Sequence, residues 1–238
     1  MNAIVVVPTY NERENLANLV EAIRKLPVAI HILIVDDNSP DGTGDIADQL
    51  ARAYPGEVFA LHRPAKEGLG RAYLAAFQHV LNSFSYEFIL QMDCDFSHDP
   101  SYIPEFLKAI QNADLVLGSR YVTGVNVVNW DFKRLLLSKF ASIYVRAITG
   151  MTFSDLTGGF KCWRRATLQA LPFDRIFSMG YLFQVETTYR TWKSPGSRIS
   201  EIPIIFYERN LGRSKINPNI IFEAFLGVIR LRFTRLRR

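Results

Sequence analysis

The fold is decided by the stretch HILIVDDNSPDGT, residues 31–43. Its first five residues are almost all apolar, as in a strand that is buried on both faces, and Asp36 and Asp37 follow directly. The residues from Asn38 to Thr43 are typical of a turn that leads into a helix. A buried strand that ends in carboxylates and passes into a helix indicates a parallel sheet covered by helices.

The same alternation of strand and helix patterns runs through the first half of the chain. We expect strands at 3–7, 31–35, 58–61, 88–91 and 115–118, and helices at about 12–25, 43–54, 69–83 and 101–111. Asn11 and Glu14 form a candidate capping pair for the first helix. The predicted fold class is therefore α/β, Rossmann-like, with a mostly parallel sheet and helices on both faces.

The second half is less regular and is expected to extend the same domain. After a loop at 122–129 we expect a basic helix at about 132–149, a strand at 159–163, a helix at 181–192, a strand at 199–202 and a polar loop at 207–217. We predict one catalytic domain over 1–217 and a basic amphipathic helix over 218–238, a candidate membrane-interface segment.

Composition narrows the class of protein. The chain has 238 residues, of which 48% are hydrophobic and 21% charged, which is typical of a globular fold. Two cysteines, Cys94 and Cys162, make no disulfide framework, and we expect a reducing cytoplasm. The strand pattern begins at Ala3, so no signal peptide is expected, and the apolar run at 220–229 is shorter than the ~20 residues of a spanning helix.

Carboxylates follow three of the expected strands. The first strand ends in VPTYNE (7–12), the second in Asp36-Asp37, and the fourth in Asp93-Cys94-Asp95. Carboxylates brought to one edge of a sheet repel one another unless a cation neutralises them, and a divalent cation carrying a diphosphate would do so. A turn after Met92 would let Asp93 and Asp95 face the same ligand. A solvated turn explains either motif alone, but their occurrence at successive strand ends favours the metal interpretation.

Several motifs together resemble one family. They are VPTYNE, IVDDNSPDGT, DCD, GSRY (118–121), DLTGGFKCWRR (155–165) and the R-x-x-G-x-S-K pattern from 209 to 215. The chain resembles family 2 glycosyltransferases, and more narrowly the dolichol or polyprenol phosphate mannose synthases, from residue 4 to about 217. The resemblance implies a GT-A fold, and an inverting transfer of mannose from GDP-mannose to a polyprenyl phosphate that depends on Mg²⁺ or Mn²⁺.

The resemblance also implies roles for individual residues. The nucleotide pocket would be formed by Pro8, Tyr10, Glu12 and Asp37, with the backbone of Cys94 beside it. Asp93 and Asp95 would bind the metal and the diphosphate, with Ser97 close by where relatives commonly have glutamine.

The resemblance places further residues around the two phosphates. Arg120 would face the donor or the acceptor phosphate. The acceptor phosphate would be held by Lys133, Arg134, Ser138, Arg209 and Lys215, and arginine suits this role because its planar fork binds phosphate bidentately. Arg134 and Ser138 share a helix face at spacing i, i+4.

Asp155 resembles an acidic residue that lies near the acceptor in many relatives and acts as a base when the acceptor is a hydroxyl. A phosphate acceptor is already anionic at neutral pH, so we expect catalysis by placement and charge stabilisation, with Asp155 orienting groups. Gln184 and Glu186 are expected to touch the sugar, to shape the floor of the site, or to be ordinary polar helix positions. His98 follows the D-x-D region, where it could lie near the metal, but it is interpreted as a loop histidine; no role is assigned to His31, His62 or His79.

The C-terminal segment mixes apolar residues with five arginines in its last nine positions. It is expected either to lie in a membrane interface or to pack on the domain with its arginines solvated. The expected partners are a sugar nucleotide, a polyprenyl phosphate lipid, a membrane surface and, as in several relatives, a small membrane-anchoring protein. Nucleic acid is not an expected partner, and the expected location is peripheral, on the cytoplasmic face of a membrane.

Two alternatives stay open at this point. One keeps the fold but uses UDP-glucose or another UDP-sugar, with polyprenyl phosphate or a glycan hydroxyl as acceptor. The other is an inactive subunit of a glycosyltransferase complex, which the presence of Asp93, Asp95, Arg120 and Arg209 disfavours. The residues of the nucleotide pocket do not distinguish guanine from uracil.

Overall fold

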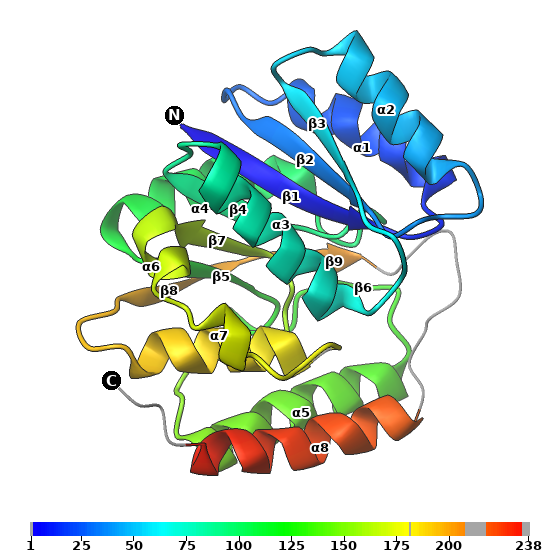
Figure 1. The fold of residues 1–238 in the computed structure, drawn as a ribbon. Coiled ribbons are helices and arrows are strands. Elements are labelled where there is room, and N and C mark those ends of the chain that lie inside the picture. Colours follow the sequence, from blue (N-terminus) through cyan, green and yellow to red (C-terminus); the bar gives the residue numbers. More distant parts are fainter. Residues whose placement is uncertain (1, 181, 208–217, 235–238) are drawn as a thin grey trace.

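The computed structural model describes residues 2–180, 182–207 and 218–234 (Figure 1). The first half alternates strands and helices: β1 (Ala3–Thr9), α1 (Arg13–Arg24), β2 (His31–Asp36), α2 (Thr43–Ala53), β3 (Val58–His62), α3 (Leu69–Ser83), β4 (Phe88–Gln91), α4 (Ile103–Ala109) and β5 (Leu115–Ser119). The second half contains β6 (Val127–Val128), α5 (Phe132–Thr149), β7 (Lys161–Arg164), α6 (Arg165–Gln169), α7 (Leu182–Lys193), β8 (Ile199–Pro203), β9 (Phe206–Tyr207) and α8 (Pro218–Phe233).

The central sheet has seven strands in the order β3-β2-β1-β4-β7-β5-β8. Neighbouring strands are parallel except β7, which runs antiparallel to both β4 and β5. Strands β1, β2 and β4 therefore lie side by side and end at the same edge. This arrangement confirms the mostly parallel α/β fold.

Side chains on both faces of the sheet are buried, as the apolar strands predicted. Along β1, Val5 and Val7 pack with α1 and α4 on one face, and Ile4 and Val6 pack with α3 on the other. A third apolar cluster joins α5, α7 and α8, with Val145, Val185 and Leu231 at its centre. The pair α5 and α8 lies apart from the sheet along one side of the molecule (Figure 1).

Two local expectations need correction, and one short helix was not predicted. Helix α1 begins at Arg13 after the N-cap residue Glu12, and no side chain caps it; Asn11 instead has φ +58° and donates its N–H to the Ser39 hydroxyl at 3.0 Å. The expected loops around 122–129 and 207 contribute the strands β6 and β9, which pair in parallel. The short helix α6 follows β7 without a break.

The C-terminal helix packs on the domain through Val228 and Leu231. Within the described ranges, no helix combines the length and the apolar character needed to cross a membrane.

Candidate active site

The rim predicted from the strand ends is present. Strand β4 ends at Gln91, so Asp93 and Asp95 lie in the loop after it, as a turn after Met92 requires. The loops after β1 and β2 are tied together beside them, because Glu12 donates its N–H to the Thr43 hydroxyl at 3.0 Å. The carboxyl ends of three adjacent strands thus bring these acidic loops to one edge.

The two aspartates after β2 have different roles. Asp36 is buried and accepts from the backbone N–H of Ser39 at 3.0 Å and from its hydroxyl at 2.6 Å, so it shapes the turn. Asp37 is also buried, and the Arg63 guanidinium donates to it at 2.6 Å. Burial raises the pKa of Asp37 although Arg63 opposes the shift. Asp37, which was predicted to bind the nucleotide, is therefore half of a buried ion pair in the loop after β2.

Arg63, which sequence reasoning did not single out, also contacts a second carboxylate. Its second terminal nitrogen donates to Glu67 at 2.6 Å. Close by, the ammonium of Lys66 lies 3.9 Å from the centre of the Tyr10 ring. Pro8, Tyr10 and Glu12 are all half-buried. An aromatic ring, cations and carboxylates are the groups that a nucleoside would meet at this edge.

The D-x-D loop is held by short local hydrogen bonds. Ser97 donates its N–H and hydroxyl to Asp95 Oδ1 at 3.1 and 2.6 Å. His98 is buried, stacks on Phe160 and accepts the backbone N–H of Asp93 on Nδ1 at 3.0 Å. Burial lowers the pKa of His98 against the charges of Asp93 and Asp95. His98 thus lies in the loop, as interpreted, and its ring positions the first aspartate of the motif.

The residues at the D-x-D fit a divalent cation carrying a diphosphate. Buried groups nearby respond to the concentrated negative charge: burial, together with Asp93 and Asp95, raises the pKa of the Tyr73 phenol well above its usual value. The described part of the chain does not gather three or more histidine, cysteine or acidic side chains around one point. Two carboxylates plus substrate phosphate oxygens are a common ligand set for Mg²⁺. Cys94 is buried, and burial raises the pKa of its thiol, so its side chain stays neutral.

Arg120 and Asp155 form a buried ion pair. The guanidinium of Arg120 donates to the two carboxylate oxygens of Asp155 at 2.6 and 2.8 Å, and its backbone N–H adds a third bond at 3.1 Å. Both residues are buried, and Thr157 accepts a further bond from the same guanidinium. Burial raises the pKa of Asp155, but Arg120 outweighs it and the net shift is downward. The pair therefore braces the site through Nε and Nη2 of Arg120, and the role of Arg120 at a phosphate remains a prediction.

The predicted acceptor residues are only partly described. Lys133 is exposed on the first turn of α5, and Ser138 of the same helix accepts a hydrogen bond at 2.8 Å from Tyr121, the neighbour of Arg120. The backbone of Arg134 lies in α5, but its side chain, like Arg209 and Lys215 entirely, lies outside the described residues. The roles of all five residues at an acceptor phosphate remain predictions.

A buried polar network forms the floor beside the D-x-D. Gln91 donates to the carbonyl of Gly159 at 2.9 Å and to the side chain of Gln184 at 2.8 Å. Lys161 donates to the Gln184 carbonyl at 2.7 Å. Burial lowers the pKa of this lysine to about 7. Gly159 packs closely here, since a Cβ would lie 3.4 Å from both Gln184 Nε2 and the His98 ring. No pattern in the sequence marked Gln91 or Lys161.

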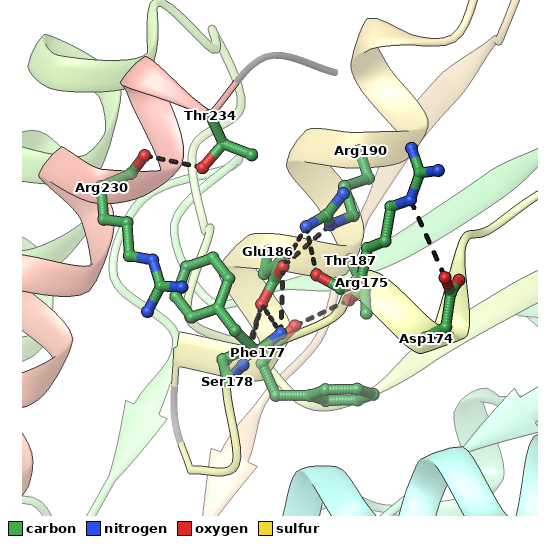
Figure 2. A network of polar contacts seen from close by, with 10 residues as sticks. Asp174, Arg175, Phe177, Ser178, Glu186, Thr187, Arg190, Arg230 and Thr234 are labelled. Carbon is green, nitrogen blue, oxygen red and sulfur yellow. Dashed lines mark hydrogen bonds and ion pairs between the residues drawn. The ribbon is translucent and has the colours of Figure 1, made fainter. Parts of the chain in front are cut away.

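Glu186 belongs to a structural network (Figure 2). Its carboxylate is fully buried and accepts from the backbone N–H and hydroxyl of Ser178 at 3.0 and 2.5 Å, and from Arg190 at 2.6 Å. Phe177 in the same loop carries the Arg230 guanidinium of α8 over its ring at 4.2 Å. The expectation that Glu186 touches the sugar is therefore wrong. Of Gln184 and Glu186, only Gln184 lies in the floor of the site.

Comparison with known proteins agrees with this geometry. A family model described as glycosyl transferase family 2 matches residues 4–171. The chain is 44% identical over 230 residues to an undecaprenyl-phosphate mannosyltransferase of Micrococcus luteus, covering 97% of this chain and 93% of that protein. It is also 44% identical over 239 residues to a polyprenol monophosphomannose synthase of Mycolicibacterium smegmatis, covering 98% and 89% of the two chains.

Two solved structures share the fold at low sequence identity. Glucosyl-3-phosphoglycerate synthase from Mycobacterium tuberculosis, solved with Mn²⁺, UDP and glucosyl-3-phosphoglycerate, aligns with a TM-score of 0.67 at 17% identity, covering 97% of this chain and 78% of that one. A mannosyltransferase from Pyrobaculum calidifontis, solved with GDP-mannose and Mn²⁺, aligns with a TM-score of 0.59 at 17% identity, covering 98% and 70%.

Proposed function

The chain belongs to glycosyl transferase family 2, and we propose that it moves mannose from GDP-mannose to the phosphate of a polyprenyl phosphate. The observation that carries the proposal is the acidic D-x-D loop at the edge shared by β1, β2 and β4. Support for the mannose donor and the lipid acceptor comes from the two relatives at 44% identity, whose names state a polyprenyl-type acceptor and a mannosyl group.

In the proposed reaction an oxygen of the acceptor phosphate attacks the anomeric carbon of mannose. The bond from that carbon to the diphosphate oxygen breaks, the electron pair leaves with GDP, and the product is a polyprenyl phosphomannose of inverted configuration. No proton has to move, because the acceptor monoester is already anionic and its second pKa is about 6. The Arg120–Asp155 pair fits this scheme, since an aspartate with a lowered pKa and a bound guanidinium is a poor general base.

The chain's residues would act chiefly by placement. Asp93 and Asp95 would hold Mg²⁺ or Mn²⁺, which when bound stabilises the negative charge on the departing diphosphate. His98 and Ser97 keep the two carboxylates in place through the bonds described above. Arg63 and Asp37 would contact the base, and Gln184 would meet the sugar. Lys133, Arg134, Ser138, Arg209 and Lys215 would hold the acceptor phosphate at a membrane surface.

The decisive experiment supplies membranes or micelles of polyprenyl phosphate with labelled GDP-mannose or labelled UDP-glucose, and Mg²⁺ or Mn²⁺. Label should enter lipid from GDP-mannose only. Thermal unfolding provides a second measurement, because a ligand at 100 times its Kd stabilises the native state by about 2.7 kcal/mol. Stabilisation by UDP and not GDP would support a UDP-sugar donor, and stabilisation by neither would support an inactive subunit.

A further inference from the structure

A chain of directed hydrogen bonds runs through the buried floor of the site. The indole N–H of Trp163 in β7 donates to Gln91 Oε1 at 2.8 Å, and Gln91 Nε2 donates to Gln184 Oε1 at 2.8 Å. All three side chains are at most 2% exposed. An indole N–H can only donate, and the carbonyl of Gly159, 2.9 Å from Gln91 Nε2, can only accept, so the Gln91 amide cannot be reversed. The chain therefore also fixes the Gln184 amide, with its oxygen toward Gln91 and its NH₂ group turned away.

The NH₂ group of Gln184 borders a small recess over Gly159. Its Nε2 atom is buried and meets no hydrogen-bond acceptor among the residues that the structure describes. A Cβ built on Gly159 would lie 3.4 Å from Gln184 Nε2 and 3.9 Å from Asp93 Oδ1, so the amide and the first aspartate of the D-x-D face the same space. The ring of His98, 3.4 Å from the same point, closes a third side. Because a buried N–H without an acceptor costs free energy, this orientation indicates a ligand that supplies an oxygen.

The polarity of this recess selects a hydroxyl group. Gln184 offers a hydrogen-bond donor to the recess, and the Asp93 carboxylate offers an acceptor. A hydroxyl both accepts and donates, so it can bond to both side chains at once, whereas a phosphate oxygen only accepts and is repelled by the carboxylate. Since the D-x-D is the proposed site of the diphosphate, the hydroxyl beside it would belong to the sugar that the diphosphate carries.

We propose that Gln184 binds one hydroxyl of the donor sugar through its amide N–H, and that Gln91 and Trp163 are positioning residues that keep this donor facing the sugar. The inference rests on the proposed function for the sugar nucleotide. It adds the atom that recognises the sugar, the polarity of that contact, and two buried residues that orient it without touching the substrate.

The test is calorimetric titration of the protein with GDP and with GDP-mannose, in the presence of Mn²⁺ and without a lipid acceptor. Gln184→Met keeps the length of the side chain without its amide, and it should bind GDP-mannose about tenfold more weakly but GDP like the wild type. Gly159→Ala places a methyl group in the recess and leaves the amide chain intact, and it should show the same selective loss. The matched control is Thr191→Val, which removes a buried hydroxyl on the same helix that donates to the Thr187 carbonyl at 3.0 Å; its affinity for both ligands should equal that of the wild type.

Analogues of the sugar separate a positioning role from a merely structural one. Among GDP-mannose analogues that each lack one hydroxyl, one should bind the wild type about tenfold more weakly than GDP-mannose does, and Gln184→Met should show no such difference. Gln91→Met and Trp163→Phe should each lose part of this discrimination while they keep the affinity for GDP. A role in stability alone would leave the discrimination intact.

Other outcomes separate the two proposals. Binding of UDP and UDP-glucose in place of GDP and GDP-mannose would refute the proposed donor, but a Gln184→Met variant that lost affinity for UDP-glucose and not for UDP would still support the amide contact. An equal loss of GDP and GDP-mannose in Gln184→Met would assign the amide to the diphosphate and overturn the inference. So would an unchanged affinity for GDP-mannose in both Gln184→Met and Gly159→Ala, which would mean that the amide holds only water.

Discussion

Replacing Lys161 by methionine should make the stability of the protein less dependent on pH. The ammonium group is fully buried beneath the site, with only the Gln184 carbonyl and the Thr188 hydroxyl, 2.7 and 2.9 Å away, as hydrogen-bond acceptors. Burial lowers its pKa from 10.5 to about 7, against the weaker opposing charge of Asp155. Methionine fills a similar volume without a charge, and Thr188 still donates to the Gln184 carbonyl at 2.9 Å.

The sign and size of the effect follow from proton binding. Above pH 7 the native lysine is neutral while the unfolded lysine keeps its proton until about pH 10.5, so raising the pH favours the native state. The slope reaches about 1.4 kcal/mol per pH unit once the native lysine is deprotonated, which gives a gain on the order of 2 kcal/mol between pH 7 and pH 9. Between pH 7 and pH 9, the free energy of unfolding of the wild type should therefore rise by this amount more than that of Lys161→Met. The hydrogen bonds lost in the variant change its stability equally at both pH values.

Urea unfolding at pH 7 and pH 9, with a reductant present for the buried thiols of Cys94 and Cys162, measures this difference. Comparing the two proteins cancels every other group that titrates in the same range. Lys108→Met on the exposed surface of α4 is the control, and its stability should follow the wild type at both pH values. If the gap between the wild type and Lys161→Met is the same at pH 7 and pH 9, the native lysine is charged and the reasoning is refuted.

Asp95→Asn keeps the shape of the side chain but should lower transfer by at least about a hundredfold and abolish metal-dependent stabilisation by nucleotide; normal turnover would remove Asp95 from the metal site. Asp155→Asn should cost about 3–5 kcal/mol in urea unfolding because it leaves the buried Arg120 charge unpaired. Arg120 outweighs burial and lowers the pKa of Asp155 below 3.8. The stability that this carboxylate contributes is therefore present above pH 3.8 and should be lost as the pH falls further. Asp155→Asn should not show this loss. Arg134→Ala should raise the KM for lipid phosphate about tenfold without changing that for sugar nucleotide, with Lys108→Ala on the exposed surface of α4 as the control; an unchanged lipid KM would exclude Arg134 from the acceptor site.

The sequence alone determined the elements of the first half and the edge where the chemistry lies. Apolar strands alternating with amphipathic helices are local patterns, and parallel strands necessarily end together, so the carboxylates after β1, β2 and β4 could be placed at one rim before any coordinates. The D-x-D after the fourth expected strand itself predicted a divalent cation carrying a diphosphate, and motif resemblance added the expected sugar donor and acceptor. These inferences needed only the order of residues along short segments.

Tertiary structure decided the contacts between residues far apart in the chain. Arg120 meets Asp155 across 35 positions and Gln91 meets Gln184 across 93, and both pairings depend on β7 inserting antiparallel between β4 and β5. The exposure of Phe132 and Phe140 on α5 was likewise hidden, because the sequence shows apolar residues but not which of them face outward. Burial, unlike periodicity, is a property of what packs against an element, and so it could be known only from the folded chain.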